Sequence, residues 1–403
     1  MDLDLDWAIG LLGWSLCRVA FGMYGRIVAL LGLSSRAAAV TFGNAESAYG
    51  ALQQWYNESN GLWVPSTGWW NSANCLTVIS DLAMIDDPIR ADVLPIYENT
   101  WVRAQQYNLQ MGKQASPPLY LPESYYTDGP MAFPSGFPIP PVIICDGFLN
   151  SYYDDEGWWA LAWIAAYDVT SNPQYLATAE DIFEDIKASY DTTPCGGVWW
   201  DKAHTYVNSI ANELFLDVAA HLANRVALRS EYYLGWAQEE WRWFQRSGLI
   251  NAQHTINDGL NDSTCQNNNG TVWSYNQGVI LGGLTELARA TRDTSYVTTA
   301  KQIADAALAA LAPSGILHDP CEPDCGGDGS QFKGVFARNL QILQQYAPET
   351  RYQTFLDDNA ESIWARDRSG SELDLIWSGG NTQPANASTQ SSALDALVGS
   401  LAT

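Results

Sequence analysis

The chain has 403 residues, 47% of them hydrophobic, and its 45 acidic residues outnumber 20 basic ones to give a formal net charge of -25. This hydrophobic content excludes a disordered chain, and the length allows a large core. The negative charge repels phosphate backbones and anionic membranes, which excludes nucleic acid as a partner and suits a neutral ligand.

Residues 1–39 are predicted to form an N-terminal segment that contains a secretory signal. From Met23 onward, a short basic start is followed by the apolar run 27–33 and by three alanines at 37–39, which is the order of a signal peptide. A membrane anchor is the alternative, but Arg18 and Arg26 interrupt the apolar stretch, so stable membrane insertion is not expected. We therefore expect a secreted or cell-wall protein.

Residues 40–403 are predicted to form a single helical domain, because no Pro/Ser-rich linker divides them and strand-like alternation is scarce. Asn172-Pro173 is a typical helix start, and the apolar residues that follow it recur on one face. The predicted helices are 44–57, 71–86, 93–110, 154–170, 173–190, 208–225, 230–247, 275–292, 295–312, 333–347, 351–368 and 388–402.

The predicted helices alternate between two kinds. One kind opens with polar, aromatic and small residues, as in DDEGWWALAWIAA and YNQGVILGGLTEL, and the other is an ordinary amphipathic helix, as in ATAEDIFEDIKASY. This alternation predicts an all-α (α/α)6 barrel, with six inner helices whose N-termini converge on one end and six outer helices. The longest non-helical stretch, 111–150, is rich in Pro and Tyr and is expected to wall a substrate cleft.

Six of the seven cysteines follow the predicted signal segment, an even number that fits disulfides in an oxidising compartment. Cys321 and Cys325 are close enough to pair with each other, whereas the pairing of four others stays open. Those four are Cys75, Cys145, Cys195 and Cys265.

Four Asn-x-Ser/Thr sequons are candidate glycosylation sites of a secreted protein. They lie at Asn57, Asn261, Asn269 and Asn386. The chain has no CxxC motif and its four histidines are scattered, so we expect no metal and no cofactor. The Asn/Asp/Gly-rich run 257–270 lacks the ligand spacing of a calcium loop and is interpreted as a solvated loop.

Two adjacent aspartates, Asp154 and Asp155, are the candidate catalytic residues. They stand at the start of a predicted helix, with paired tyrosines before them and paired tryptophans after Gly157. Glycosidic bond cleavage normally needs two carboxyl groups, and two so close together cannot both ionise easily, so one can act as the acid. The alternative is that these acids only cap a helix. Exposed aromatic pairs instead favour a sugar ligand, on whose rings they stack.

The block FLNSYYDDEGWWALAWIAAYDVT, followed by CGGVWWDK, NSIANELFLDVAAHLANR, WSYNQGVILGGLTELARAT and CGGDGSQFKGVFARNL, resembles the glycoside hydrolase family 76 α-1,6-mannanases. The resemblance runs from about residue 50 to 400. It implies an (α/α)6 barrel and a retaining mechanism. It also implies that Asp154 is the nucleophile and Asp155 the general acid/base.

Other residues at the starts of inner-type helices and in the VWWDK turn are candidate substrate contacts, for which core packing or helix capping is the alternative. Arg338 either holds a carboxylate in place or forms an ion pair within the barrel. The candidates are Tyr153, Trp158, Trp199, Trp200, Asn212, Glu213, Tyr275, Asn276, Gln277, Lys333, Arg338 and Asn74.

The resemblance favours an endo-acting hydrolase of the α-1,6-mannan backbone, expected to act as a monomer. The first alternative is a cell-wall transglycosidase that acts on the mannan core of glycosylphosphatidylinositol-anchored proteins, and it shares the covalent intermediate. The second is a non-catalytic mannan-binding protein, against which the intact aspartate pair argues.

Overall fold

The structure is a computed structural model that describes residues 39–106, 110–116, 121–126, 147–380 and 383–403. The segment Ala37–Thr403 forms one compact unit. The predicted secretory signal lies outside the described residues and stays a prediction. Among the helices in the described ranges, none combines the length and the apolar character that crossing a bilayer requires.

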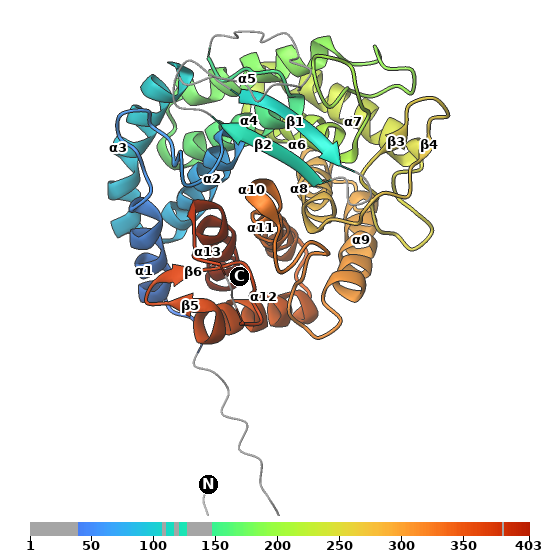
Figure 1. Cartoon of the computed structure of the whole chain (residues 1–403). Helices are drawn as coiled ribbons and strands as arrows, with labels where there is room; N and C mark the ends of the chain where they lie inside the picture. The colour runs from blue at the N-terminus through green and yellow to red at the C-terminus, as the bar shows by residue number, and fades with distance from the viewer. Residues whose placement is uncertain (1–38, 107–109, 117–120, 127–146, 381–382) are drawn as a thin grey trace, which may run out of the picture. The chain divides into compact units, whose positions relative to one another are not determined.

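Six helices form a closed inner ring, in which each helix packs against the next and the last returns to the first (Figure 1). Their sides are buried almost all round; in the fourth of them, every residue from Ser274 to Ala288 is buried. The inner helices are α2 (Trp69–Ile85), α4 (Tyr153–Thr170), α6 (Ser209–Arg225), α8 (Ser274–Thr291), α11 (Phe332–Tyr346) and α13 (Ala387–Leu401).

A second set of helices covers this ring, each packed against one or two inner helices. These helices bury one side only, because apolar residues recur at helical spacing; α5 buries Tyr175, Leu176, Ala179, Ile182, Phe183 and Ile186. The predicted all-α (α/α)6 barrel is therefore confirmed. The outer helices are α1 (Phe42–Gln53), α3 (Asp87–Arg103), α5 (Pro173–Ala188), α7 (Ser230–Ser247), α9 (Ser295–Leu311) and α12 (Thr350–Ser362).

Capping residues set several helix bounds. The side chains of Asn172 and Asn208 accept from backbone N–H groups in the first turns of α5 and α6, which otherwise have no partner. Gly248 adopts a φ of 82°, the left-handed conformation that ends α7. The predicted helix 351–368 is shorter than expected, because the α-helical pattern stops at Ser362 and a π-turn, η3 (Ile363–Asp367), follows.

The short elements lie in the connections. The predicted non-helical stretch contains an antiparallel hairpin, β1 (Gln110–Ser116) and β2 (Leu121–Tyr126), and β2 lies against the one-turn helix α10 (Gly326–Gly329). Two further hairpins have strands of two residues each. The remaining short elements are η1 (Ala104–Gln106), η2 (Ala227–Arg229), β3 (Leu260–Asn261), β4 (Gln266–Asn267), β5 (Arg368–Ser369) and β6 (Glu372–Leu373).

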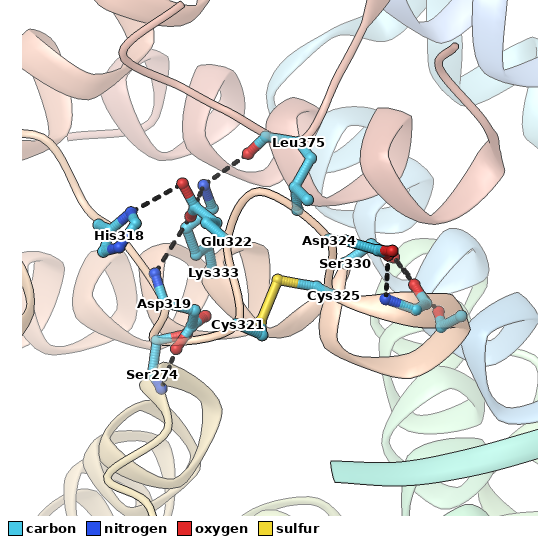
Figure 2. Close-up of a disulfide and its surroundings, with 12 residues drawn as sticks. Ser274, His318, Asp319, Cys321, Glu322, Asp324, Cys325, Ser330, Lys333 and Leu375 are labelled. Atoms are coloured by element: carbon cyan, nitrogen blue, oxygen red, sulfur yellow. Dashed lines mark hydrogen bonds and ion pairs between the residues drawn. A yellow bond between two sulfur atoms is a disulfide. The ribbon is translucent and has the colours of Figure 1, made fainter. Parts of the chain in front are cut away.

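Two disulfides join connections on the described part of the chain. The predicted pair Cys321–Cys325 is confirmed (Figure 2), and Cys195 pairs with Cys265. Cys75 in α2 is a free, buried thiol, so the expectation that all six cysteines enter disulfides is wrong for this residue. Cys145 lies outside the described residues.

Candidate active site

Helix α4 begins with three consecutive carboxylates that are all buried. Asp154, Asp155 and Glu156 occupy its first turn, with 6%, 0% and 0% of their surface exposed. The N-cap is Tyr152, whose side chain makes no capping hydrogen bond. The partial positive charge at the helix N-terminus stabilises nearby carboxylates. Each of the three also accepts a hydrogen bond from outside the helix.

Asp154 is contacted by a tryptophan from the turn that follows α5. The indole nitrogen of Trp200 donates to Oδ2 of Asp154 over 3.1 Å. The backbone N–H of Tyr153 donates to the carbonyl of Trp200 over 2.9 Å, and Tyr152 forms an isolated bridge with Asp201. The Trp200 indole is therefore positioned by backbone contacts with the helix that carries Asp154.

The turn that carries Trp199 and Trp200 is held by Asn212 of α6. The side-chain oxygen of Asn212 accepts from the backbone N–H of Val198 over 2.8 Å, and its amide nitrogen donates to the Val198 carbonyl over 3.1 Å. Gly197 has a φ of 70°, and a Cβ there would lie 2.3 Å from the Asn212 oxygen. Only glycine allows this close approach.

Asn150, just before α4, links two of the carboxylates. Its side-chain amide donates to Oδ2 of Asp155 over 2.7 Å, and its backbone N–H donates to Oε1 of Glu156 over 2.8 Å. Its side-chain oxygen accepts from the backbone N–H of Tyr152 over 2.8 Å. One residue therefore fixes the entry into the helix and the orientation of Asp155.

Glu156 belongs to an ion-pair cluster rather than to the acid pair. The ammonium of Lys202 lies 2.7 Å from Oε1 of Glu156 and 2.8 Å from Oδ2 of Asp185. It also lies 5.5 Å from the ring centroid of Tyr153. Burial raises the pKa of Glu156, and the positive charge of Lys202 opposes this rise.

Aromatic rings from four inner helices gather at the same end of the barrel. Trp70 of α2 stacks on Trp158 of α4 with centroids 5.6 Å apart, and its indole nitrogen donates to Asp328 over 2.7 Å. Tyr275 of α8 stacks on Phe332 of α11 with centroids 3.8 Å apart. These contacts bring the starts of α2, α8 and α11 together around the start of α4.

A further buried carboxylate, that of Asp258, interacts electrostatically with Tyr275. The hydroxyl of Tyr206 donates to Oδ2 of Asp258 over 2.7 Å, and burial raises the pKa of Asp258 to about 7. Burial likewise raises the pKa of Tyr275, and the negative charges of Asp258, Asp154 and Glu213 raise it further. The Tyr275 phenol is thus held neutral.

The arrangement offers two adjacent carboxylates with different partners. Asp154 accepts from an indole, whereas Asp155 accepts from an amide. Neighbouring carboxylates in unlike environments are the groups that acid/base and nucleophilic steps at a glycosidic bond require. The aromatic rings around them provide surfaces on which a sugar ring can stack.

The sequence profile of the family described as glycosyl hydrolase family 76 matches residues 147–403, which is more than half of the chain. The chain belongs to glycosyl hydrolase family 76. The match covers α4 and everything after it, including the acid pair Asp154 and Asp155.

Named relatives of this family 76 chain are fungal. A putative mannan endo-1,6-alpha-mannosidase of Schizosaccharomyces pombe is 33% identical over 215 residues, which cover 49% of this chain and 48% of the relative. The mannan endo-1,6-alpha-mannosidase DFG5 of Candida albicans is 29% identical over 228 residues, or 52% of this chain and 50% of the relative. The chain thus aligns with about half the length of the curated relatives it matches.

Solved structures share the fold over most of their length. The GH76A α-1,6-mannanase of a Salegentibacter species superposes with a TM-score of 0.71 at 19% identity, covering 89% of this chain and 98% of that one. The Lin0763 protein of Listeria innocua has a TM-score of 0.70 at 22% identity, covering 89% and 96%. At these identities the likeness supports the fold alone.

Within the family 76 barrel, several predicted contact residues already have protein partners. Trp199 stacks on His204 with centroids 5.0 Å apart, and Asn212 holds the turn before it. The amide of Gln277 bonds the backbone N–H and carbonyl of Ile256. These contacts are structural, and a substrate contact for any of these side chains stays a prediction.

Lys333 is also engaged, in the disulfide loop shown in Figure 2. Its ammonium lies 2.6 Å from Oε1 of Glu322 and donates to the carbonyl of Leu375 over 2.6 Å. In the same loop, Asp319 accepts from the backbone N–H and hydroxyl of Ser274 at the start of α8. The loop thereby ties α11 to α8, because Glu322 bonds Lys333 of α11 and Asp319 bonds Ser274 of α8.

Arg338 and Asn74 do not join the acid pair. Two guanidinium nitrogens of Arg338 bond the two oxygens of Asp395 over 2.9 and 2.7 Å, and a third donates to Asn74 over 2.9 Å. This geometry corresponds to the alternative interpretation of Arg338, an ion pair within the barrel. By contrast, Glu213 and Asn276 are fully buried, and their side-chain oxygens have no hydrogen-bond partner among the described residues.

Sequence reasoning missed Asn150, Asp258 and Asp328. Asp258 lies in the run 257–270, and the interpretation of that run as a solvated loop is wrong at its start, where Asn257 and Asp258 are 8% and 5% exposed. No spacing signal marks Asp258 and Asp328, since their partners Tyr206 and Trp70 lie far away in sequence. The partners of Asn150 are only two to six residues away, but no recognised motif links an asparagine to the acids that follow it. The hydrogen bonds of Asp258 with a tyrosine and of Asp328 with a tryptophan can be recognised only in the folded structure.

The four sequons are placed in connections or at a helix start. Asn261 and Asn269 are exposed, and Asn57 is half-buried. Asn386 is the N-cap of α13, where its side chain accepts from the backbone N–H groups of Ser388 and Thr389. Glycosylation of these residues stays a prediction. In the described ranges, no group of three or more His, Cys, Asp or Glu could hold a metal ion.

Proposed function

We propose that this family 76 chain is a retaining glycoside hydrolase that cleaves α-1,6-mannosidic bonds inside mannan. The observation that carries the proposal is the buried acid pair at the start of α4, in which Asp154 accepts from Trp200 and Asp155 from Asn150. Membership of glycosyl hydrolase family 76 supports the reaction class. The names of the fungal relatives support the linkage and the substrate.

In the first step, a carboxylate oxygen of Asp154 forms a bond to the anomeric carbon while the glycosidic carbon–oxygen bond breaks. Asp155 gives its proton to the departing oxygen, so the leaving sugar departs as an alcohol and Asp155 becomes a carboxylate. The result is a covalent mannosyl-enzyme intermediate. The Trp200 indole, 3.1 Å from Asp154, orients the attacking carboxylate.

In the second step, water attacks the anomeric carbon and the bond to Asp154 breaks. Asp155 takes the proton of that water, which restores both carboxyl groups to their starting states. Two displacements at one carbon retain its configuration. Attack by a sugar hydroxyl in place of water turns the same intermediate into a transglycosylation product.

One solved relative supports both the proposed substrate and the proposed roles of the two aspartates. One structure is described as an inactive variant of the Salegentibacter α-1,6-mannanase, with two consecutive aspartates changed to asparagine, in complex with α-1,6-mannotriose. That pair supports assigning the chemistry here to the consecutive residues Asp154 and Asp155. We also propose a secreted protein, a location that the disulfides Cys195–Cys265 and Cys321–Cys325 favour.

The test is product analysis on unbranched α-1,6-mannan with the wild type, Asp154→Asn and Asp155→Asn. The exposed Asp92→Asn in α3 is the matched control. We expect short mannose oligomers from the wild type and the control, and none from the two site variants. Transferred chains that form only when an acceptor glycan is added would assign the protein to transglycosylation. Binding of mannan without turnover by the wild type would overturn the catalytic proposal.

Added azide distinguishes the nucleophile from the general acid/base when the substrate is an aryl α-1,6-mannobioside with a good leaving group. In Asp155→Ala, azide attacks the mannosyl-enzyme and gives the α-glycosyl azide, with net retention. In Asp154→Ala, azide replaces the nucleophile and gives the β-glycosyl azide, with inversion. The opposite pair of products would exchange the roles of Asp154 and Asp155.

A further inference from the structure

The Trp200 turn, residues 195–200, is covalently tied to a second connection of the barrel. Its first residue, Cys195, forms a disulfide with Cys265, which lies 70 positions later in the run 257–270 between α7 and α8. Both cysteines are half-buried, so the bond lies near the surface. The turn ends at the residue whose indole donates to the proposed nucleophile. One disulfide therefore joins the segment that contacts the acid pair to a distant part of the sequence.

Between the disulfide and the tryptophans, the turn contains two adjacent glycines. Gly196 and Gly197 have φ angles of 75° and 70°, the left-handed conformation that glycine adopts at no steric cost. A Cβ on these glycines would lie 2.7 and 2.8 Å from the indole of Trp243 in α7, so the turn packs directly against that ring. Glycine loses more conformational freedom on folding than other residues do. The turn therefore needs contacts outside itself to keep its shape.

The other end of the disulfide also depends on its surroundings. Cys265 has a φ of 53°, which a residue with a Cβ keeps only where contacts hold it. Its sulfur lies 3.5 Å from the carbonyl oxygen of Pro194, and the sulfur of Cys195 lies 3.7 Å from the carbonyl oxygen of Asp262. The two segments thus pack against each other around the disulfide.

Trp200 lies between the disulfide and a set of hydrogen bonds to the same run 257–270. The backbone N–H of Trp200 donates to the carbonyl of Tyr206 over 2.8 Å, and the hydroxyl of Tyr206 donates to Asp258 over 2.7 Å. A hydrogen bond is exchanged for one to water at a small net cost, whereas a disulfide is broken only by a reductant. Without it, hydrogen bonds such as that from the Trp243 indole to the carbonyl of Cys195, 2.8 Å, have to hold the glycine side.

We propose that the Cys195–Cys265 disulfide is a positioning element for the nucleophile Asp154, on which it acts through the Trp200 turn. Once the disulfide is broken, the glycines are free to move away from Trp243, and the hydrogen bond of 3.1 Å from the Trp200 indole to Asp154 is weakened. The attacking carboxylate is then less well oriented, so formation of the mannosyl-enzyme slows while mannan still binds. This role presupposes the proposed hydrolase function, in which Asp154 is the attacking group.

Reduction of the disulfide is therefore expected to slow catalysis. A dithiol such as dithiothreitol gives two electrons and two protons to the disulfide, which becomes two thiols, and the dithiol closes into a disulfide of its own. The half-buried Cys195 and Cys265 are more accessible to it than Cys321 and Cys325, which are 8% and 1% exposed. Mild reduction of the full chain should lower kcat by about tenfold, and reoxidation should restore it.

Hydrogen exchange at the Trp200 indole tests the positioning role without any substrate. NMR of the full chain with isotope-labelled tryptophan resolves the indole N–H groups, and the signal of Trp200 is the one missing from Trp200→Phe. We expect this N–H to exchange with water at least about tenfold faster in Cys195→Ser/Cys265→Ser than in the wild type, because its hydrogen bond opens more often. Unchanged exchange would overturn the proposal.

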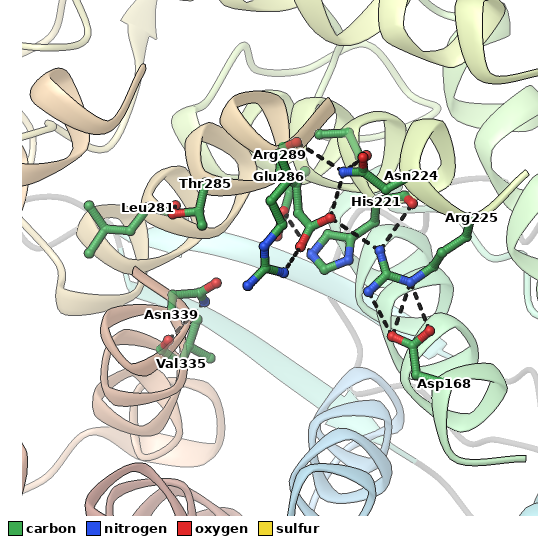
Figure 3. A network of polar contacts seen from close by, with 12 residues as sticks. Asp168, His221, Asn224, Arg225, Leu281, Thr285, Glu286, Arg289, Val335 and Asn339 are labelled. Carbon is green, nitrogen blue, oxygen red and sulfur yellow. Dashed lines mark hydrogen bonds and ion pairs between the residues drawn. The ribbon is translucent and has the colours of Figure 1, made fainter. Parts of the chain in front are cut away.

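A variant that weakens the barrel elsewhere distinguishes positioning from a general loss of stability. Figure 3 shows Arg225 bonded to Asp168 and Glu286, with the closest nitrogen–oxygen distances 2.7 and 3.2 Å. Asp168 follows Asp154 by 14 residues on α4, which is about 21 Å along the helix. Arg225→Met removes this cation and should leave the Trp200 exchange and kcat unchanged. Equal acceleration of exchange in Arg225→Met and in the cysteine variant would overturn the proposal.

Kinetics on unbranched α-1,6-mannan tests the link to catalysis. The variant Cys195→Ser/Cys265→Ser is expected to lose about tenfold in kcat, with KM changed by less than about twofold. Trp200→Phe should lower kcat as well, and adding it to the cysteine variant should cause little further loss, because both changes act on the same hydrogen bond. Losses that multiply independently would contradict the proposed role.

Two further outcomes are distinguishable. Cys321→Ser/Cys325→Ser should keep the wild-type response to the dithiol, whereas a response that persists in Cys195→Ser/Cys265→Ser would overturn the assignment to this disulfide. A wild type that is inactive on mannan would refute the proposed function, and the exchange of the Trp200 indole would still decide whether the disulfide positions the turn.

Discussion

The side-chain amide of Asn150 donates a 2.7 Å hydrogen bond to Oδ2 of Asp155. The same residue accepts from Tyr152 and donates through its backbone to Glu156, so its own position is fixed. A residue held in this way orients Asp155 without touching the reacting bond. Asn150 is thus a positioning residue for the proposed general acid.

Asn150→Ala is expected to lower kcat on mannan by up to about 100-fold, because small misplacements of a catalytic group have effects of this size. The deficit should shrink with an aryl mannoside whose leaving group needs no protonation. Asn224→Ala is the matched control, since Asn224 also donates to a carboxylate, Glu286, over 2.8 Å. Steady-state kinetics on both substrates measures the effect, and an equal deficit on the two substrates would contradict it.

Most helices can be predicted from sequence because their apolar periodicity is local. The predictions for α7 and α9 are right to within one residue, whereas the predicted helix 93–110 is displaced from α3 (Asp87–Arg103) by six residues or more. The site was only partly predictable. The acid pair lies in consecutive positions with aromatic neighbours, which is a local signal. Asp258 bonds Tyr206 and Asp328 bonds Trp70, residues 52 and 258 positions away in the sequence, and no local pattern encodes such pairs. Asn74 and Arg338 were assigned to the site because a sequence motif does not indicate how deep in the barrel a helical residue lies.

The ion pairs of Lys202 with Glu156 and Asp185 lead to a prediction about stability. Lys202→Met removes the cation between Glu156 and Asp185, and leaves Glu156 buried without its counter-charge. We expect the free energy of unfolding to fall by about 3 kcal/mol, the order found when one partner of a buried pair is deleted. Urea unfolding measures it. The double variant Glu156→Gln/Lys202→Met should recover part of the loss, and additive losses would contradict the coupling.

Buried carboxylates determine how stability depends on pH. Burial raises the pKa of Asp258 to about 7 and those of Asp319 and Asp395 to about 6. The folded protein then binds more protons than the unfolded chain between about pH 4 and 7, so its free energy of unfolding falls as pH rises through that window. For Glu286, burial is outweighed by His221 and the adjacent arginines, and its pKa is lowered to about 2.

The stabilising contribution of Glu286 is therefore lost as pH falls from about 4.5 to 2. Together these groups predict maximal stability near pH 4 to 5, measurable by urea unfolding across the pH range. Asp258→Asn should reduce the decline between pH 4 and 7, whereas the exposed Asp92→Asn should not. Stability that rises steadily from pH 4 to 7 would rule out this account.

The two disulfides should contribute unequally to stability. Cys195–Cys265 joins residues 70 apart in sequence, whereas Cys321–Cys325 joins residues 4 apart. In the chain-entropy model, the longer loop restricts the unfolded chain more, which gives roughly 4 kcal/mol against roughly 2 kcal/mol. Replacing each pair by serines and measuring urea unfolding tests this order. A larger loss from the Cys321→Ser/Cys325→Ser variant would instead show that the short loop matters through its folded-state contacts, with Glu322 and Lys333 foremost among them.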